Sequence, residues 1–500
     1  MASETAKVDP RGVAASFQRA ETASEAVDRL AELYANSVAA LREALKRYLT
    51  DATPPTAAQR ASGAFSYPEL RITYAPAGPP PPVSRAFGKF SETGVYVQTV
   101  TRPDLFRAYL VEQISLLQDE YDIVIETGLS TDEIPFSYVL DGADDLDLDA
   151  AESAQLVRQF PYADLSRIDD ALPNGERVGE SPDRRPLSLF TAARTDYSLQ
   201  RVKHYTGTPY EDVQRYVLFT NYHRYVDAFV DWAARQLKAD KGYTALSAAG
   251  FVTVDGDSAD PVGEIAGAAW RRYQMPAYHL KAPGGKGVTL VNIGVGPSNA
   301  KTITDHLAVL RPECWLMIGH CGGLRHSQRL GDYVLAHAYL RYDSVLDRDI
   351  PLEIPVPPIA EIQVALQDAV RKVSGDRGEA LKRRLRTGTV VTYADRNWEL
   401  RYHAEAKRIN QSRAIAVDME SATIAANGFR LRVPYGTLLC VSDKPLHGEL
   451  KLPGAANRFY ERAVGEHLMA GIETVESLRR EGSHVLHSRK LRSFDEPPFR

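Results

Sequence analysis

Three features that mark particular classes of protein are scarce or absent in this chain of 500 residues. Only three cysteines occur, with no CxxC pair and no Cys/His spacing, so neither a disulfide framework nor a metal site is expected. No apolar run reaches about 18 residues, the length of a membrane span, and the N-terminus does not resemble a signal peptide. No lysine- and arginine-rich tract occurs and the formal net charge is only −5, which argues against nucleic acid or a membrane as the main partner.

These absences favour a cytoplasmic protein that binds a small molecule. Cys314, Cys321 and Cys440 lie in apolar or glycine-rich surroundings and are expected to be reduced core thiols. With 44% apolar residues, a chain of 500 residues exceeds what one hydrophobic core usually supports, so we expect two domains. The polar, turn-rich segment 173–186 has the composition of a boundary, which divides the chain into residues 1–190 and residues 191–500.

The first part combines helix and strand patterns. Residues 25–49 place apolar side chains on one helical face with charges opposite, which predicts an amphipathic helix. Residues 95–100 alternate as a strand does. We therefore expect a separate N-terminal α+β domain, and we recognise no acid/base set in it.

The second part alternates short apolar runs rich in β-formers with helical stretches. Strands buried on both faces and separated by helices predict an α/β fold with a mixed, largely parallel sheet flanked by helices. Ligand sites in such sheets gather at the C-terminal ends of the strands. The expected strands are 216–220, 288–293, 314–318, 333–338, 387–392, 414–417 and 436–441, and the clearest helices are 299–310 and 421–428.

Two of these strands end in glycine-rich loops. The first loop contains Gly294 and Gly296 before a helix, where free backbone N–H groups and the helix dipole favour an anion. It does not match a dinucleotide fingerprint, because Asn299 replaces the third glycine. The second loop runs from Gly319 through Gly322. Two such loops in one unit favour a ligand site over tight packing alone.

Two acids lie at strand ends near the C-terminus. Glu420 belongs to the run Val-Asp-Met-Glu-Ser (417–421), and Asp443 ends the run Val-Ser-Asp (441–443), 23 residues later (443 − 420). A buried strand that ends in a carboxylate, together with a second acid, can place two acids at the mouth of one pocket. This arrangement suits cleavage of a glycosidic bond, which needs a proton donor and a nearby negative charge.

These runs, together with Gly-His-Cys-Gly-Gly (319–323), resemble the purine nucleoside phosphorylase and nucleosidase superfamily. Further segments resemble its bacterial AMP nucleosidase branch, and they extend over nearly the whole chain. They are 101–107, 133–136, 201–207, 219–229, 311–320, 395–401, 443–449 and 486–492. The resemblance implies a phosphorylase-like fold and hydrolysis of AMP to adenine and ribose 5-phosphate without a cofactor in the chemistry. It also implies regulation by Mg-ATP and inorganic phosphate, a homohexamer, and a regulatory and assembly role for residues 1–190.

The resemblance assigns the two acids their roles. Asp443 matches the aspartate that hydrogen-bonds purine N7 and delivers a proton to the leaving base. An ordinary aspartate is protonated about once in a thousand at pH 7, a handicap of about 4 kcal/mol, so burial or a proton transfer concerted with bond cleavage is needed. Glu420 matches the glutamate that accepts from both ribose hydroxyls, with Met419 packing on the sugar. Trp398 lies where relatives place an aromatic against the base, although a core position is equally compatible, and the role of Asp418 stays open.

The phosphate-binding residues of the phosphorylases are only partly present. Arg224 matches an arginine that holds inorganic phosphate, but the glycine of its loop is lost, and an Arg-x-Gly-Ser motif reads Met-Ile-Gly-His at 317–320. This departure favours water over phosphate as the nucleophile. His320 and His223 are the candidates for activating that water.

Several cations are candidates for holding the 5′-phosphate of the nucleotide. They are Lys301, Arg271, Arg272 and residues of a neighbouring subunit, and the sequence does not choose among them. Arg458 resembles an arginine that approaches the catalytic aspartate. Three rival functions stay open: a nucleoside phosphorylase, a non-catalytic adenine-nucleotide sensor and, with least support, a nucleotide-dependent dehydrogenase.

Overall fold

The computed structural model describes residues 17–76, 78–140, 150–176, 184–450, 455–486, 489–494 and 496–500, without the side chains of 150–153, 455–462, 483 and 489. The chain divides into two compact units, Met1–Gln200 with Phe494–Arg500, and Arg201–Ser493. The predicted division at residue 190 precedes α6 (Ala192–Thr206), whereas the boundary between the units falls inside that helix. Part of the turn-rich segment behind that prediction, residues 177–183, lies outside the described residues.

The first unit is built on an antiparallel sheet with helices. Among its described residues, five strands lie in the order β1-β4-β2-β3-β5, and only β3 and β5 run parallel. The strands are β1 (Gln18–Ala20), β2 (Ser66–Tyr74), β3 (Gly94–Thr99), β4 (Ile123–Glu133) and β5 (Arg185–Pro186). The helices are α1 (Ala23–Asp51), α2 (Ala57–Ala61), α3 (Arg107–Gln118), α4 (Ser137–Leu140) and α5 (Ala150–Gln159). The predicted α+β class is confirmed.

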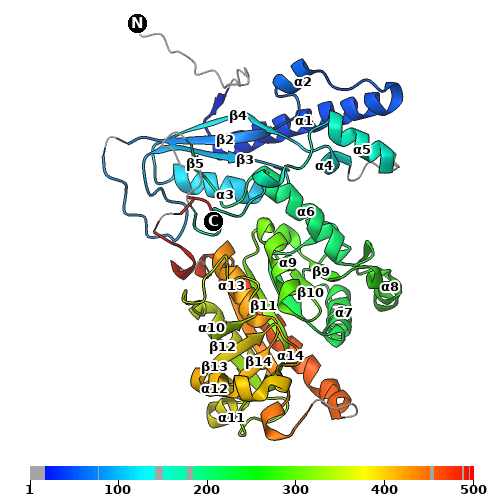
Figure 1. The fold of residues 1–500 in the computed structure, drawn as a ribbon, viewed down its shortest axis with the longest axis vertical. Helices are drawn as coiled ribbons and strands as arrows, with labels where there is room; N and C mark the ends of the chain where they lie inside the picture. Colours follow the sequence, from blue (N-terminus) through cyan, green and yellow to red (C-terminus); the bar gives the residue numbers. More distant parts are fainter. Residues whose placement is uncertain are drawn as a thin grey trace. The chain divides into compact units, whose positions relative to one another are not determined.

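Helix α1 is the long amphipathic helix expected at residues 25–49. It begins after Thr22, whose hydroxyl accepts a hydrogen bond from the backbone N–H of Glu25 at 3.1 Å and so satisfies one orphan donor of the first turn. Val27 and Leu30 are fully buried in the main core of the unit. The helix packs on β2, β4 and α3 (Figure 1).

The second unit contains a mixed sheet covered by helices (Figure 1). Its strands are β6 (Tyr216–Thr220), β7 (Ala245–Ala248), β8 (Val252–Val254), β9 (Ala277–Lys281), β10 (Val288–Asn292), β11 (Cys314–Gly323), β12 (Tyr333–Tyr342), β13 (Leu385–Tyr393), β14 (Ala416–Asp418) and β15 (Tyr435–Asp443). Its helices are α7 (His223–Lys238), α8 (Pro261–Gly267), α9 (Pro297–Leu307), α10 (Ala360–Ser374), α11 (Gly378–Arg384), α12 (Tyr402–Ser412), α13 (Ser421–Leu431) and α14 (Ala455–Glu481). The predicted α/β class is confirmed.

One strand joins an open sheet to a closed barrel. In the described part of the unit, the strand order is β14-β13-β12-β15-β11-β6-β10-β9-β7-β8, and β14 also pairs with β11. The strands from β14 to β11 therefore close into a barrel, while β6 to β8 continue as an open sheet. Strands β6, β10, β11 and β15 run parallel, so their C-terminal ends meet at one edge.

The three cysteines are buried and free in the second unit, as the sequence analysis expected. No helix in the described ranges is both long and apolar enough to cross a bilayer.

The C-terminus belongs to the first unit, which the sequence did not suggest. Phe499 is only 1% exposed and lies in the core that α1 covers. Its backbone N–H donates to the carbonyl of Leu187 at 2.9 Å, and the N–H of Arg500 donates to the side chain of Gln113 at 2.7 Å. The last residues therefore complete the core and the hydrogen bonding of a domain that starts almost 500 residues earlier.

We expect Phe499→Ala to lower the free energy of unfolding of the first unit by about 3–5 kcal/mol, because the substitution leaves a cavity in a closed core. Urea unfolding followed by fluorescence measures this change. Phe494→Ala is the matched control, since the ring of Phe494 is 94% exposed in the same segment. Equal losses for both variants would contradict a core role for Phe499.

Candidate active site

Candidate site residues follow strands whose C-terminal ends share one edge of the sheet. Asn221 comes directly after β6, the loop 293–296 follows β10, and Asp443 ends β15. Because β6, β10, β11 and β15 are mutually parallel, these positions lie at the same edge. Glu420 reaches this edge from β14, which pairs with the C-terminal end of β11.

The carboxylate of Glu420 is held by two segments far away in the sequence. Glu420 is fully buried between β14 and α13. One oxygen accepts from the backbone N–H of Gly296 at 2.7 Å, and the other accepts from the side-chain amide of Asn221 at 2.9 Å. Gly296 is the residue before the first turn of α9, the helix end that the sequence predicted to favour an anion. In this structure that anion is the chain's own glutamate.

Burial and a neighbouring acid change the acidity of Glu420. Removal from water raises its pKa to about 8, and repulsion from Asp418 acts in the same direction. The hydrogen bonds from Gly296 and Asn221 oppose the rise but do not cancel it. The carboxyl of Glu420 therefore binds a proton near neutral pH, and positive charge brought beside it would favour the ionised form.

Asp418, whose role the sequence left open, faces the start of α13. One carboxylate oxygen accepts from the hydroxyl of Thr392 at 2.6 Å, and the other accepts from the backbone N–H of Ser421 at 2.9 Å and from the Ser421 hydroxyl. Burial raises the pKa of this carboxyl as well. These bonds cap the first turn of α13, so Asp418 fixes the backbone on which Glu420 sits.

Asp443 lies on the opposite side of β11 from the segment that carries Glu420. Gly322 of β11 pairs with Asp443 of β15 on one side and with Val417 of β14 on the other. Neighbouring strands are about 4.8 Å apart, so the two acid-bearing segments are separated by about 10 Å at this level. The two acid-bearing segments therefore flank the C-terminal end of β11.

A β-bulge sets the direction of the Asp443 side chain. Cys321 pairs with Val441 and Gly322 with Asp443, which leaves Ser442 as an extra residue on β15. Bulges re-aim side chains and are common beside active sites. The Ser442 hydroxyl donates to a carboxylate oxygen of Asp443 at 2.6 Å. Asp443 itself is half-buried.

The glycines of β11 allow this close packing. A Cβ at position 319 would lie 3.1 Å from the side-chain oxygen of Asn221, and a Cβ at 322 would lie 3.0 Å from Val417. A side chain at position 319 would therefore crowd both the end of Met317, 2.6 Å from the added Cβ, and the amide that holds Glu420. Gly294 and Gly296 have positive φ values of 66° and 117°, which few other residues adopt.

His320 ends a hydrogen-bonded chain of buried side chains. Nε2 of His467 donates to the carbonyl of Leu438 at 3.0 Å, so its Nδ1 accepts from the Tyr225 hydroxyl at 2.6 Å. The hydroxyl oxygen then accepts from Nε2 of His320 at 3.1 Å. Burial lowers the pKa of His467 to about 3 and keeps its ring neutral. This chain of hydrogen bonds assigns the proton of a neutral His320 ring to Nε2 and leaves Nδ1 as an acceptor.

His223, the other candidate base, contacts side chains outside the segments that carry the two acids. Its ring stacks on Trp270 with centroids 4.3 Å apart, and its Nε2 lies 3.5 Å from a carboxylate oxygen of Asp227. Arg271 covers Trp270 with its guanidinium 4.3 Å from the ring centroid, and Arg272 is exposed beside it. The side chains of His223, Asp227, Trp270 and Arg271 thus contact one another and not the two acids.

Trp398 is a core residue and offers no open surface to a base. Its side chain is 3% exposed and stacks on Tyr393 with centroids 5.8 Å apart. Half-buried Met419 packs on the same apolar cluster. The cluster therefore packs against the segment before Glu420 through Met419.

The predicted phosphate-binding cations are not gathered in one place. Lys301 pairs with Asp305 at 2.7 Å, one turn along α9, and Arg430 contacts the same carboxylate at 3.0 Å. Arg224 is half-buried in the first turn of α7. The side chain of Arg458 lies outside the described residues. In the described ranges, no cluster of three or more His, Cys, Asp or Glu side chains could hold a metal ion.

Asn221 is the site residue that sequence reasoning missed. The loop after β6 was noted only for Arg224, although Asn221 comes first after the strand end, where ligand sites concentrate. That position was the available signal. Its partner lies 199 residues away, which no local pattern reveals.

Comparison with known proteins gives two family matches. The model described as "Bacterial AMP nucleoside phosphorylase N-terminus" matches residues 25–183, and the "Phosphorylase superfamily" model matches residues 250–468. AMP nucleosidase of Escherichia coli (strain K12) is 57% identical over 480 residues, which are 96% of this chain and 98% of that protein. The same values hold for AMP nucleosidase of Escherichia coli O157:H7.

Two solved structures match part of the chain. AMP nucleosidase from Bacteroides thetaiotaomicron VPI-5482 is 28% identical and covers 58% of this chain and 99% of that chain, with a TM-score of 0.42. Purine nucleoside phosphorylase from Toxoplasma gondii, in complex with immucillin-H, is 16% identical and covers 55% and 95%, with a TM-score of 0.39.

The raised pKa of Glu420 predicts a pH-dependent stability. Between its usual pKa of 4.5 and about 8, the folded chain holds a proton that the unfolded chain releases, so this stabilisation is lost as pH rises through about 8. Glu420→Gln removes the titration and should therefore gain thermal stability relative to the wild type between about pH 6 and about pH 8.5. Unfolding temperatures measured at one scan rate test this, with exposed Glu399→Gln as the control. A difference independent of pH would contradict the raised pKa.

Proposed function

This chain belongs to the AMP nucleosidase family, and we propose that it cleaves AMP with Glu420 and Asp443 on either side of the bound nucleotide. It is an N-glycosyl hydrolase that converts AMP and water to adenine and ribose 5-phosphate. The observation that carries this function is the 57% identity to a curated AMP nucleosidase over 96% of the chain. The sequence resemblance is thereby confirmed.

In this proposal, Glu420 stabilises the sugar as the base leaves. Bond cleavage places positive charge on the ribosyl group, and a buried carboxylate with a raised pKa lacks a compensating positive charge. The developing cation supplies that charge, so the interaction strengthens in the transition state rather than in the ground state. The ribose hydroxyls would donate to the same carboxylate.

Asp443 would donate a proton to the leaving base, and His320 would accept a proton from water. Asp443 gives a proton to N7 of the purine, which leaves as neutral adenine. Water adds to the ribosyl carbon, and Nδ1 of His320 receives the proton that water loses. The support for His320 is its fixed tautomer, with Nε2 donating to Tyr225. No charge accumulates on the base or on the nucleophile.

The substrate and the reaction can be tested together by adenine release from AMP and from adenosine, with and without inorganic phosphate. We expect adenine from AMP in phosphate-free buffer and a much slower reaction with adenosine, because the 5′-phosphate contributes binding energy. The other product should be ribose 5-phosphate. Strict dependence on phosphate would identify a phosphorylase, and no turnover with intact AMP binding would identify a sensor.

Asp443→Asn should reduce kcat for AMP by about 10² or more, because an amide cannot supply the proton to the leaving base. The dissociation constant for AMP should change little, since the isosteric side chain keeps its contacts. Ser442→Ala is the neighbouring control, because it removes the hydroxyl that donates to Asp443 at 2.6 Å but leaves the acid. A kcat for Asp443→Asn equal to that of the wild type would exclude Asp443 as the acid.

The first unit is proposed to be regulatory and to assemble the enzyme. The sequence predicts that this domain ends near residue 190. We propose Mg-ATP as an activator, inorganic phosphate as a second effector, a homohexamer as the assembly and the cytoplasm as the location. The support is the match of residues 25–183 to an N-terminal family model distinct from the phosphorylase fold. Adding ATP with magnesium to the AMP assay, and sedimentation velocity of the full chain, test these points. An unchanged rate and a monomer would contradict them.

A further inference from the structure

The side chain of Asn221 holds one oxygen of Glu420 from a distant part of the chain. Asn221 follows β6 directly, and its partner lies 199 residues later. Nδ2 of Asn221 donates to Oε2 of Glu420 at 2.9 Å. The other oxygen, Oε1, accepts from the backbone N–H of Gly296 at 2.7 Å. Asn221 is therefore a donor to this carboxylate that a side-chain substitution can remove.

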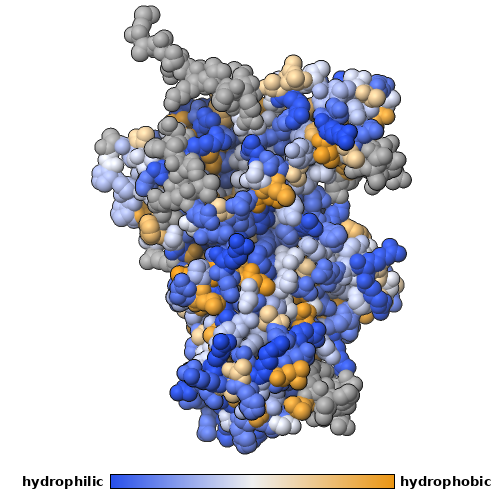
Figure 2. Space-filling view, viewed as in Figure 1, coloured by the Kyte–Doolittle hydropathy of each residue, from blue (hydrophilic) through white to orange (hydrophobic). Residues whose placement is uncertain are grey.

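Glu420 is an acid that depends on the protein for its solvation. The face of the molecule in Figure 2 is largely hydrophilic, and water stabilises charged groups on such a surface. Glu420 is fully buried, so its ionised form relies on hydrogen bonds from the protein instead. Loss of one donor from a buried charged group costs more than the same loss at the surface. We therefore expect the bond from Asn221 to matter for the charge of Glu420.

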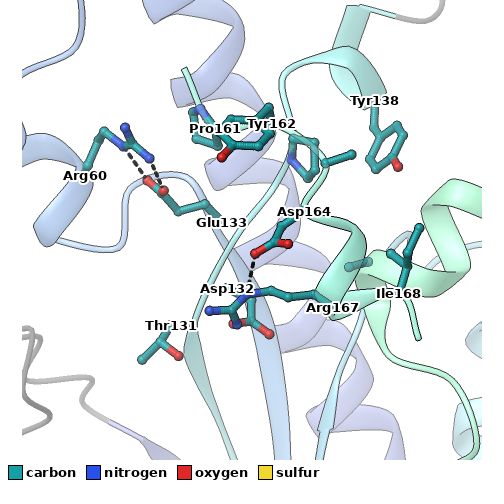
Figure 3. Close-up of a pocket in the computed structure, with 13 residues that line it drawn as sticks. Arg60, Thr131, Asp132, Glu133, Tyr138, Pro161, Tyr162, Asp164, Arg167 and Ile168 are labelled. Carbon is teal, nitrogen blue, oxygen red and sulfur yellow. Dashed lines mark hydrogen bonds and ion pairs between the residues drawn. The ribbon is translucent and has the colours of Figure 1, made fainter. Parts of the chain in front are cut away.

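The acids that line the cavity of the first unit are held differently. In Figure 3, the side chain of Arg60 points at Glu133 and forms two hydrogen bonds with it, and Arg167 bonds to Asp132. A guanidinium brings a positive charge to its acid, whereas an amide or a backbone N–H brings a neutral donor. The donors from Asn221 and Gly296 are both neutral, so they stabilise the ionised form of Glu420 without cancelling its charge.

The orientation of the Asn221 amide follows from its surroundings. An ionised carboxylate only accepts hydrogen bonds, so the NH2 group faces Glu420 and the amide oxygen faces away from it. That oxygen lies beside β11, where a Cβ added at Gly319 would be 3.1 Å from it. The glycine thus leaves room for the amide in the orientation that donates to Glu420.

Groups that can carry charge on the elements around Glu420 have partners other than Asn221. Burial raises the pKa of Glu420 most, and repulsion from Asp418 adds to the rise. The groups are Asp418 on β14, bonded to Ser421; His320 on β11, bonded to Tyr225; Asp343 after β12, bonded to Thr423; Asp443 on β15, bonded to Ser442; and Lys301 and Asp305 on α9, paired with each other. Replacement of Asn221 therefore removes one donor of Glu420 and leaves these bonds in place.

We propose that Asn221 is a positioning residue of the active site, which acts on AMP cleavage through the carboxylate of Glu420. Its amide stabilises the ionised form, which is the form that can face positive charge on the ribosyl group. The bond from Gly296 holds the other oxygen, so two contacts fix the plane of the carboxylate. The effect on cleavage rests on the proposed function, whereas the effect on the protonation of Glu420 does not.

Infrared titration of the full chain without AMP tests the effect on protonation. The carboxylic acid C=O band that is present in the wild type and missing in Glu420→Gln reports protonated Glu420. Asn221→Leu is close in size to the wild-type residue but has no donor. Its band should therefore persist to a pH about one to two units higher than in the wild type, the shift that corresponds to one hydrogen bond to a charged group.

Asn299→Leu is the matched control for this titration. Its amide donates to the carbonyl of Ile293 at 2.9 Å, in the loop next to Gly296, and not to Glu420. The control should lose the band at the same pH as the wild type. An unchanged midpoint in Asn221→Leu, or an equal shift in the control, would overturn the proposal.

The pH dependence of kcat/KM for AMP tests the effect on cleavage. At low pH, Asn221→Leu should be about tenfold to a hundredfold below the wild type, because a smaller fraction of its Glu420 is ionised. The ratio of the two values should rise toward one as the pH increases and Glu420 ionises in both enzymes. A ratio that stays low at every pH would mean that Asn221 acts through the general structure of the site, and it would overturn the proposal.

Asn221→Asp separates the donor from the shape of the side chain. A protonated aspartate donates an O–H to an ionised neighbour, and two adjacent carboxyls share one proton because both charges together are unfavourable. The acid limb of kcat/KM should therefore lie at or below the wild-type pH in this variant. A rise equal to that of Asn221→Leu would contradict the role of the donor. If the wild type did not cleave AMP at all, the proposed function would fail while the infrared titration still decided whether Asn221 controls Glu420.

Discussion

The buried carboxylate of Glu420 is the interaction on which the rest of the candidate site depends. A buried acid must be hydrogen-bonded, and here its two oxygens take their donors from Asn221 after β6 and Gly296 before α9. These contacts tie three strand ends together at one edge of the sheet. The glycine at position 319 avoids a tight contact of 3.1 Å between a Cβ and the side-chain oxygen of Asn221. The constraint therefore reaches from one carboxylate to the backbone of three strands.

The electrostatics of this edge favour positive charge beside Glu420. Burial and Asp418 raise the pKa of Glu420 to about 8, so the resting site carries less negative charge than its two acids suggest. Burial destabilises the ionised form of this carboxylate, so positive charge that forms beside it stabilises that form strongly. The same arrangement would bind a neutral ground state weakly. Binding a cationic transition state more tightly than the ground state is what speeds a reaction.

The sequence predicted the fold class, the expected strands of the second unit and the two acids at strand ends, because periodicity and strand-end position are local signals. It could not predict that Trp398 stacks inside the core or that Lys301 forms an ion pair with Asp305. A tryptophan or a lysine has the same local sequence pattern whether it contacts a ligand or another side chain of the protein. Asn221 and the return of Phe499 to the first unit depend on partners hundreds of residues away. Such long-range pairing is visible only in the folded chain.

Strand β15 has Val441 and Asp443 on either side of an irregularity. Val441 is bonded to the segment at Gly331 and Asp332, and the next residue, Ser442, is the extra residue of the bulge before Asp443. A regular ladder resists displacement because every shift breaks several hydrogen bonds, whereas a bulge leaves one residue without ladder partners. The extra residue at Ser442 thus sets the direction of the Asp443 side chain. The acid that follows the bulge is therefore aimed by an irregularity that begins directly after Val441, whose backbone is held by the segment at Gly331 and Asp332.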